Sequence, residues 1–166
     1  MQEIKQKISL FVFIAIVEVI QFLSSSLVWL AVTTWYPDLV KPFFNPPNWL
    51  FAPVWTILYL LIALSGWMVW KEREGKERAV DLALTVYGIQ LVLNAVWSYL
   101  FFGSRLLGLA FGEMIILWMA IAANIYFFKK ISKRAAYLLI PYLLWVSFAA
   151  LLNFSVWQLN SQVIGL

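Results

Sequence analysis

Long apolar runs separated by short polar connections dominate the chain. A helix needs roughly 20 mostly apolar residues to cross about 30 Å of hydrocarbon. Five runs reach this length: residues 8–30, 49–70, 82–102, 106–128 and 135–157. Because lipid offers the backbone no hydrogen bonds, runs of this length must form helices and not open strands. The pattern therefore predicts an all-α integral membrane bundle of five transmembrane helices, with residues 1–166 as a single domain.

The first apolar run also has the basic start of a secretory signal peptide, since Lys5 and Lys7 precede it. Its 23 residues are longer than a typical signal-peptide core, and no small-x-small cleavage site stands out near Leu30. We therefore interpret this run as a membrane span.

Basic residues gather in the connections on one side of the expected membrane. If the spans alternate in direction, ten Lys and Arg residues share a side with the N-terminus, and only Lys41 and Arg105 lie on the other. The ten are Lys5, Lys7, Lys71, Arg73, Lys76, Arg78, Lys129, Lys130, Lys133 and Arg134. Because basic loops stay in the cytoplasm, this asymmetry predicts a cytoplasmic N-terminus and a C-terminus outside. Separate short loops do not form a continuous nucleic-acid surface, so no nucleic-acid partner is expected.

Composition narrows the chemistry that such a bundle could perform. Hydrophobic residues make up 64% of the chain and charged residues 12%, far from the values of soluble domains. The sequence has no Cys and no His, which excludes thiol chemistry, imidazole general bases and the usual zinc, haem or copper ligands. No metal site is therefore expected, and the unusual feature that remains is the set of 10 Trp residues.

The tryptophans divide by their positions along the spans. Trp55, Trp97 and Trp145 fall on faces that also carry polar residues, whereas Trp67 and Trp118 have no role that the sequence reveals. The remaining five lie near span ends, as in the aromatic belt at a membrane interface: Trp29, Trp35, Trp49, Trp70 and Trp157. The Trp excess is thus interpreted as part anchorage and part binding site.

Polar residues inside the spans recur at helical spacing, so each set shares one face of its helix. The sets are Glu18, Gln21 and Ser25; Trp55 and Tyr59; Gln90, Asn94, Trp97 and Ser98; Glu113 and Asn124; and Trp145, Ala149, Leu152 and Asn153. Polar groups at membrane depth tend to face the bundle interior. These faces would line a shared cavity with amide and indole donors. Alternatively, the same residues only hydrogen-bond one helix to another.

The first connection, residues 31–48, is the longest and is rich in Pro, Asn and aromatic residues. A long loop in a compact bundle is often a lid or a binding loop, and we expect this one to cover a pocket. Trp35 and Tyr36 are equally typical of residues that anchor a loop at headgroup depth. Both interpretations remain open at the level of composition.

Gly108 and Gly112 form a G-x-x-x-G step near the start of the fourth run. This spacing lets two helix backbones approach closely, and it predicts a homodimer that packs through these glycines. Packing between two helices of the same chain would use the same pair.

Three stretches have more specific patterns than a generic membrane helix. Residues 41–49 read KPFFNPPNW and are followed by PVW at residues 53–55. Residues 90–97 read QLVLNAVW, and residues 138–157 read LLIPYLLWVSFAALLNFSVW. In order and spacing these stretches resemble the TspO/MBR family of tryptophan-rich sensory proteins and translocator proteins. The resemblance covers about residues 35–157, and the first span matches only in hydrophobicity.

The resemblance implies a five-helix receptor or sensor that binds tetrapyrroles such as protoporphyrin IX, and also hydrophobic drugs, in a pocket closed by the first loop. Carried over position by position, the ligand-binding residues would be Tyr36, Trp55, Tyr59, Asn94, Trp97, Ser98, Trp145, Phe148, Ala149 and Leu152. Aromatic walls suit a flat macrocycle, because they supply stacking area.

Some members of the family are reported to degrade porphyrin in light. The positions that correspond to the two implicated tryptophans are Trp55 and Trp145, which are therefore the candidate catalytic residues. An excited porphyrin can exchange an electron with a nearby indole, so no cofactor beyond the tetrapyrrole ligand is required. Alternatively, both indoles form only the pocket wall and the photochemistry belongs to the ligand.

Two other functions remain open: a transporter of porphyrins or lipophiles, and an accessory signalling subunit that docks a cytoplasmic partner. The expected partners are membrane lipid, a lipophilic small molecule and a second copy of the chain. Vertebrate members carry a sterol-recognition pattern where this chain has Phe154 and Gln158, so sterol binding is not expected there. This difference favours a prokaryotic cell membrane over a mitochondrial outer membrane.

Overall fold

The computed structural model describes residues 2–161. All regular elements in this range are helical: α1 (Gln2–Thr34), the short 3₁₀ helix η1 (Tyr36–Asp38), α2 (Asn48–Trp70), α3 (Glu77–Ser98), the π-helical turn η2 (Tyr99–Gly103), α4 (Leu107–Ile131), α5 (Lys133–Leu138) and α6 (Ile140–Asn160). Five helical segments of this range are long and apolar enough to cross a membrane, which confirms the predicted all-α bundle of five spans.

The spans are longer than predicted, and two differences concern the first and fifth of them. Helix α1 continues to Thr34, so the first four residues of the expected loop are helical. The hydroxyl of Thr33 donates to Trp29 O (2.8 Å), and that of Thr34 donates to Leu30 O (2.6 Å), so both polar side chains are satisfied within the helix. The fifth span runs through α5 and α6 and is interrupted at Leu139, two residues before Pro141.

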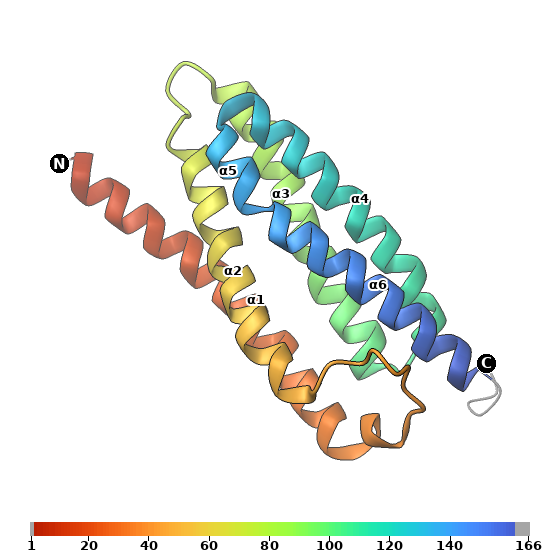
Figure 1. Cartoon of the computed structure of the whole chain (residues 1–166). Helices are drawn as coiled ribbons and strands as arrows, with labels where there is room; N and C mark the ends of the chain where they lie inside the picture. The colour runs from red at the N-terminus through yellow and green to blue at the C-terminus, as the bar shows by residue number, and fades with distance from the viewer. Residues whose placement is uncertain (1, 162–166) are drawn as a thin grey trace.

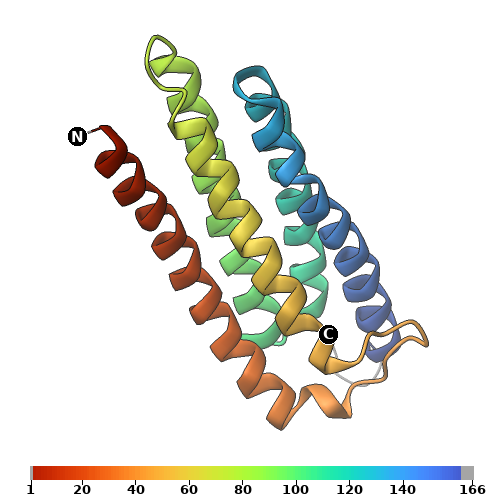
Figure 2. The ribbon, with the colours of Figure 1, turned by 60° about the vertical axis from the view of Figure 1, so that its left-hand side comes forward.

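Helix α1 lies at the edge of the bundle, and its N-terminal part stands away from the other helices in both views (Figures 1 and 2). Within its most apolar stretch 11% of α1 is buried, against 33% in each of the other four spans. Most of its side chains, such as Phe11 and Ile16, are exposed and would face lipid. Its C-terminal half lies beside α2, and its N-terminal half contacts α2 through Ser9 and α3 through Phe13.

Polar side chains connect the helices at several depths. Ser65 of α2 donates to Ala135 O of α5 (2.8 Å), Asn124 of α4 donates to Ala83 O of α3 (3.2 Å), and Asn153 of α6 donates to Leu107 O of α4 (2.9 Å). Each bond satisfies a group that hydrocarbon would leave without a partner. For Asn124 and Asn153, which belong to the predicted polar faces, the structure shows hydrogen bonds between helices.

Gly108 serves packing within the chain. A Cβ atom at this position would lie 2.8 Å from the indole of Trp157, so the missing side chain is what allows α6 to approach α4. Gly112 is exposed and has open space above it. The homodimer stays a prediction, and of the two glycines only Gly112 has a free surface to offer it.

The connection between α1 and α2 crosses over one end of the bundle and reaches the C-terminal end of α6 (Figures 1 and 2). Asn160 holds it there, since its side chain accepts from Val40 N (3.0 Å) and donates to Val40 O (2.9 Å). We call this the loop end of the bundle, and the opposite end, where Lys71 and Lys130 lie, the basic end.

Candidate ligand-binding site

A cavity of about 740 Å³ lies inside the bundle toward the loop end. We call it the bundle cavity. From α1 and η1 it is lined by Gln21, Phe22, Ser24, Ser25, Ser26, Val28, Trp29, Val32 and Tyr36. From α2 onward it is lined by Asn48, Trp49, Phe51, Ala52, Trp55, Thr56, Tyr59, Trp97, Ser98, Phe101, Phe102, Trp145, Ala149, Leu152 and Asn153.

Aromatic rings form most of the wall of the bundle cavity. On α2, Trp55 and Tyr59 are one turn apart and their rings lie 5.4 Å apart at 31°. On α6, Trp145 meets Phe51 of α2 edge-on at 6.0 Å. At the end of α3, the Trp97 ring lies 5.5 Å from that of Phe101. These rings supply large flat apolar surfaces from three helices.

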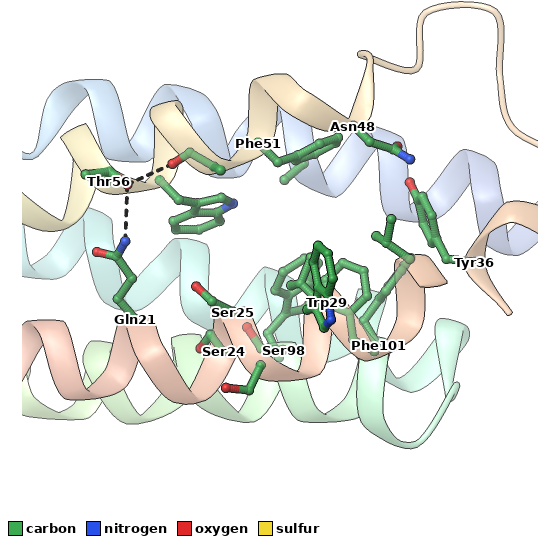
Figure 3. A pocket seen from close by; sticks show the side chains of 18 of the residues that line it. Gln21, Ser24, Ser25, Trp29, Tyr36, Asn48, Phe51, Thr56, Ser98 and Phe101 are labelled. Atoms are coloured by element: carbon green, nitrogen blue, oxygen red, sulfur yellow. Dashed lines mark hydrogen bonds between the residues drawn. The ribbon is translucent and has the colours of Figure 1, made fainter. Parts of the chain in front are cut away.

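Few polar groups interrupt this wall, and several of them come from α1. Ser24 and Ser25 lie on the α1 side of the cavity, while Gln21 donates to Thr56 Oγ1 across to α2 (3.2 Å), as Figure 3 shows. This bond joins α1 and α2 at the end of the cavity nearest the middle of the bundle. Gln21 thus pairs with another helix and not with Glu18 one turn away.

The indole nitrogens of the wall differ in what they bind. Trp97 Nε1 donates to Asn153 Oδ1 (3.1 Å) and is committed to the fold. Trp145 Nε1 is buried and finds no acceptor among the described residues. A buried indole N–H ordinarily has a partner, so this donor is available to a polar group of a bound molecule.

Behind the wall, a buried network fixes Tyr59. The Tyr59 hydroxyl donates to Asn94 Oδ1 (2.5 Å), and Asn94 Nδ2 donates to the Tyr142 hydroxyl (3.0 Å). The Tyr59, Asn94 and Tyr142 side chains are nearly or fully buried. The network ties α2, α3 and α6 together directly beneath the cavity, which holds the Trp55 and Tyr59 rings in place.

The loop closes the cavity through one side chain of η1. Tyr36 is 4% exposed, lines the cavity and donates its hydroxyl to Asn45 Oδ1 (3.4 Å). Burial raises the pKa of the Tyr36 phenol above its usual value, so this group stays a neutral donor at ordinary pH. In Figure 3 Tyr36 and Asn48 lie together at one end of the cavity, and Gln21 and Thr56 lie at the other.

Most of the predicted ligand-binding residues come together here. Eight line the bundle cavity: Tyr36, Trp55, Tyr59, Trp97, Ser98, Trp145, Ala149 and Leu152. Asn94 and Phe148 lie one layer behind it. Asn94 is occupied by the two tyrosines, and the Phe148 ring packs against Trp145 and against Phe44 of the loop. Their roles in this arrangement are to support wall residues.

Sequence reasoning expected a cavity face on α1 from Gln21 and Ser25, but it missed the apolar residues that complete this face. Residues Gln21, Ser25, Val28 and Val32 recur at helical spacing and face the cavity, yet only the first two are polar enough to be noticed. Trp29 and Trp49, expected only as interfacial anchors, also line the cavity although they are 73% and 71% exposed. They lie at its rim, where a span end and the cavity mouth coincide.

Comparison with known proteins agrees with this geometry. The family model of the TspO/MBR family matches residues 13–158. The tryptophan-rich protein TspO of Chlorobaculum tepidum is 45% identical over 132 residues, which is 76% of this chain and 79% of that protein. The TspO protein of Archaeoglobus fulgidus is 42% identical over 133 residues (79% and 83%), and the translocator protein of Ovis aries is 40% identical over 126 residues (76% and 75%).

The matched region includes all the helices that build the bundle cavity, and the relatives match over about three quarters of their own length. The chain is therefore an integral membrane protein that belongs to the TspO/MBR family.

Proposed function

We propose that this protein is a membrane receptor or sensor that binds tetrapyrroles such as protoporphyrin IX, and other flat hydrophobic molecules, in the bundle cavity. The observation that carries the proposal is the cavity itself, because about 740 Å³ enclosed by Trp, Tyr and Phe rings suits a large planar ligand. The few polar groups at its ends would orient the ligand, as in most small-molecule sites.

The proposal is tested by filling the cavity from α6. Ala149 lines the cavity, whereas Leu151, two residues later, is 54% exposed on the outer face. Ala149→Phe should weaken protoporphyrin IX binding by about tenfold or more, because its ring takes up ligand volume. Leu151→Phe is the matched control and should leave binding unchanged. Quenching of Trp fluorescence in a titration measures the affinity, and equal affinities for the two variants would contradict the proposal.

We propose as a second, finer function that bound porphyrin is degraded in light with the help of Trp55 and Trp145. Both indoles line the bundle cavity, so both would lie beside a bound macrocycle. An excited porphyrin accepts an electron from an electron-rich indole, or it activates oxygen in contact with one. The two helices would thus supply donors to opposite parts of one ligand.

The photochemical proposal is tested by the double variant Trp55→Phe with Trp145→Phe, which keeps an aromatic wall but removes both indoles. We expect a slower loss of porphyrin absorbance under illumination. The control is Trp67→Phe with Trp118→Phe, since neither of these indoles lines the cavity. Equal photobleaching by the two double variants would assign the photochemistry to the ligand alone.

A further inference from the structure

The loop end of the bundle carries only two of the twelve basic residues of the chain, Lys41 and Arg105. They come from different connections, one between α1 and α2 and the other between η2 and α4. In the part of the chain that the structure describes, no acidic side chain forms an ion pair with either. Both cations are therefore available to bind an anion.

Lys41 lies against the residue that closes the cavity. Its Nζ is 4.8 Å from the centre of the Tyr36 ring and donates to Pro37 O and Leu39 O, both at 3.1 Å. An ammonium group has three hydrogens, so these two contacts leave one for another acceptor. The backbone carbonyls fix the position of the charge without neutralising it.

Arg105 makes a similar cation–π contact with Trp35, the ring next to Tyr36. Its guanidinium carbon lies 5.3 Å from the centre of the Trp35 ring. The backbone of Arg105 has a φ of 59°, in the left-handed region that residues other than glycine rarely adopt. Bonds from Ser104 N to Tyr99 O (2.8 Å) and from Leu106 N to Leu100 O (2.9 Å) hold this bend on both sides.

Of the two rings that carry these cations, Tyr36 lines the cavity at the end opposite Gln21 and Thr56 (Figure 3). The Trp35 ring packs beside it: Trp35 and Tyr36 meet edge-on at 6.2 Å, and each lies 6.4 Å from the ring of Phe101, a residue of the cavity wall. Lys41 therefore contacts a lining residue of the cavity, and Arg105 contacts the ring next to it.

The opposite end of the cavity has no cation among the residues that line it. The side chains there, Gln21 and Thr56, are neutral. A carboxylate of a ligand would be attracted by the two cations at the loop end. The two cations therefore favour one orientation of an anionic ligand in the cavity.

We infer that Lys41 and Arg105 form an anion site at the loop end of the cavity, which binds the carboxylates of a tetrapyrrole diacid while its macrocycle lies among the aromatic walls. The inference rests on the proposed function and adds the residues that bind the carboxylates and the orientation of the ligand. Arginine pairs with a carboxylate through two parallel hydrogen bonds, and lysine adds a point charge. The carboxylates would stay near water, and the apolar ring system would enter the bundle.

The test compares protoporphyrin IX with its dimethyl ester, which has the same macrocycle without the charges. The parent protein, in nanodiscs of zwitterionic lipid, should bind the diacid about tenfold more tightly than the diester. Lys41→Gln and Arg105→Gln should each reduce diacid affinity, and the double variant should bind both ligands equally. Diester affinity should stay the same in all variants, which also shows that the cavity is intact.

Lys71→Gln is the matched control. The Nζ of Lys71 lies over the Trp67 ring at 3.7 Å, a cation–π contact of the same kind, but at the basic end of the bundle. This variant should keep the parent's preference for the diacid. A double variant at Lys41 and Arg105 that also keeps it, or a parent without any preference, would overturn the anion site alone. A parent that binds neither ligand would overturn the proposed function and the anion site together.

Discussion

The hydrogen-bond partner of a polar side chain shows its structural role in this bundle. Trp118 Nε1 donates to Ser147 Oγ (2.9 Å), and Trp67 Nε1 lies between Gln6 O (3.3 Å) and Ser9 Oγ (3.2 Å). The local sequence pattern indicated no role for these two indoles, because it does not show an acceptor that lies on another helix. Both connect helices, as polar groups in hydrocarbon commonly do.

At this scale the strongest expectation concerns Asn94. Asn94→Ala removes the partner of both Tyr59 and Tyr142 and leaves two buried hydroxyls unsatisfied, which should lower the free energy of unfolding by about 2–4 kcal/mol. Ser147→Ala, which removes one exposed bond to Trp118, should cost about 1 kcal/mol or less. Unfolding in detergent measures both, and comparable losses would argue that the buried network does not stabilise the bundle.

Helices meet in this structure where side chains are small. The indole of Trp157 fills the space over Gly108 between α4 and α6, and Gly66 of α2 is approached in the same way by Phe13 and Tyr87. Gly112, one turn after Gly108, has nothing within contact distance. A single G-x-x-x-G step therefore has one glycine turned inward and one turned outward.

This difference predicts opposite effects of one substitution. Gly108→Ala would place a Cβ 2.8 Å from Trp157 and should destabilise the protein by about 1–3 kcal/mol. Gly112→Ala meets open space and, because alanine favours helices, should be neutral or stabilising by up to about 1 kcal/mol. Thermal unfolding of the two variants side by side provides the comparison. Equal destabilisation would mean that Gly108 does not set the spacing of α4 and α6.

The predicted homodimer is tested on the outer face of α4. The exposed side chains Ile116 and Met119 surround Gly112 on that face, so a second α4 could approach there. Gly112→Leu should shift the protein from dimer to monomer in size-exclusion chromatography with light scattering, while Gly112→Ala should not. A monomeric parent, or a dimer that tolerates leucine, would exclude this face as the interface.

Basic residues are distributed unevenly along the long axis of the molecule. Ten basic residues belong to the N-terminal segment and the two connections at the basic end, and two belong to the loop end. This asymmetry predicts that the bundle lies in a membrane with its basic end in the cytoplasm. The bundle cavity, near the loop end, would then open toward the outer leaflet.

The orientation can be measured directly, because the chain has no cysteine of its own. Phe43→Cys lies on the loop, where the side chain is 101% exposed, and Glu74→Cys lies on the exposed connection between α2 and α3. In intact cells a membrane-impermeant thiol reagent should label the first and spare the second until the membrane is opened. The reverse pattern would invert the predicted topology.

Part of the candidate site was predictable, because helical spacing shows which residues share a face of one helix. Trp55 with Tyr59, and Trp145 with Ala149, share a face of their own helix, so helical spacing alone grouped them. The same spacing also selected Asn94, which lies behind the wall, because periodicity gives the face of a helix and not the depth of a side chain. It did not reveal Val28, Val32 or Trp29, which are apolar like the rest of α1 and differ only in having the cavity beside them.

The sequence by itself determined the five spans, the basic asymmetry and the family, because hydrophobic thickness, loop charge and motif spacing are local properties of the chain. Only the tertiary structure decided that Val28, Val32 and Trp29 complete the α1 wall, that Gly108 faces Trp157 and that Lys41 and Arg105 lie against neighbouring rings. These features depend on contacts between residues far apart in the chain. No local pattern encodes them, because the same apolar helix can pack on lipid or on another helix with little change in sequence.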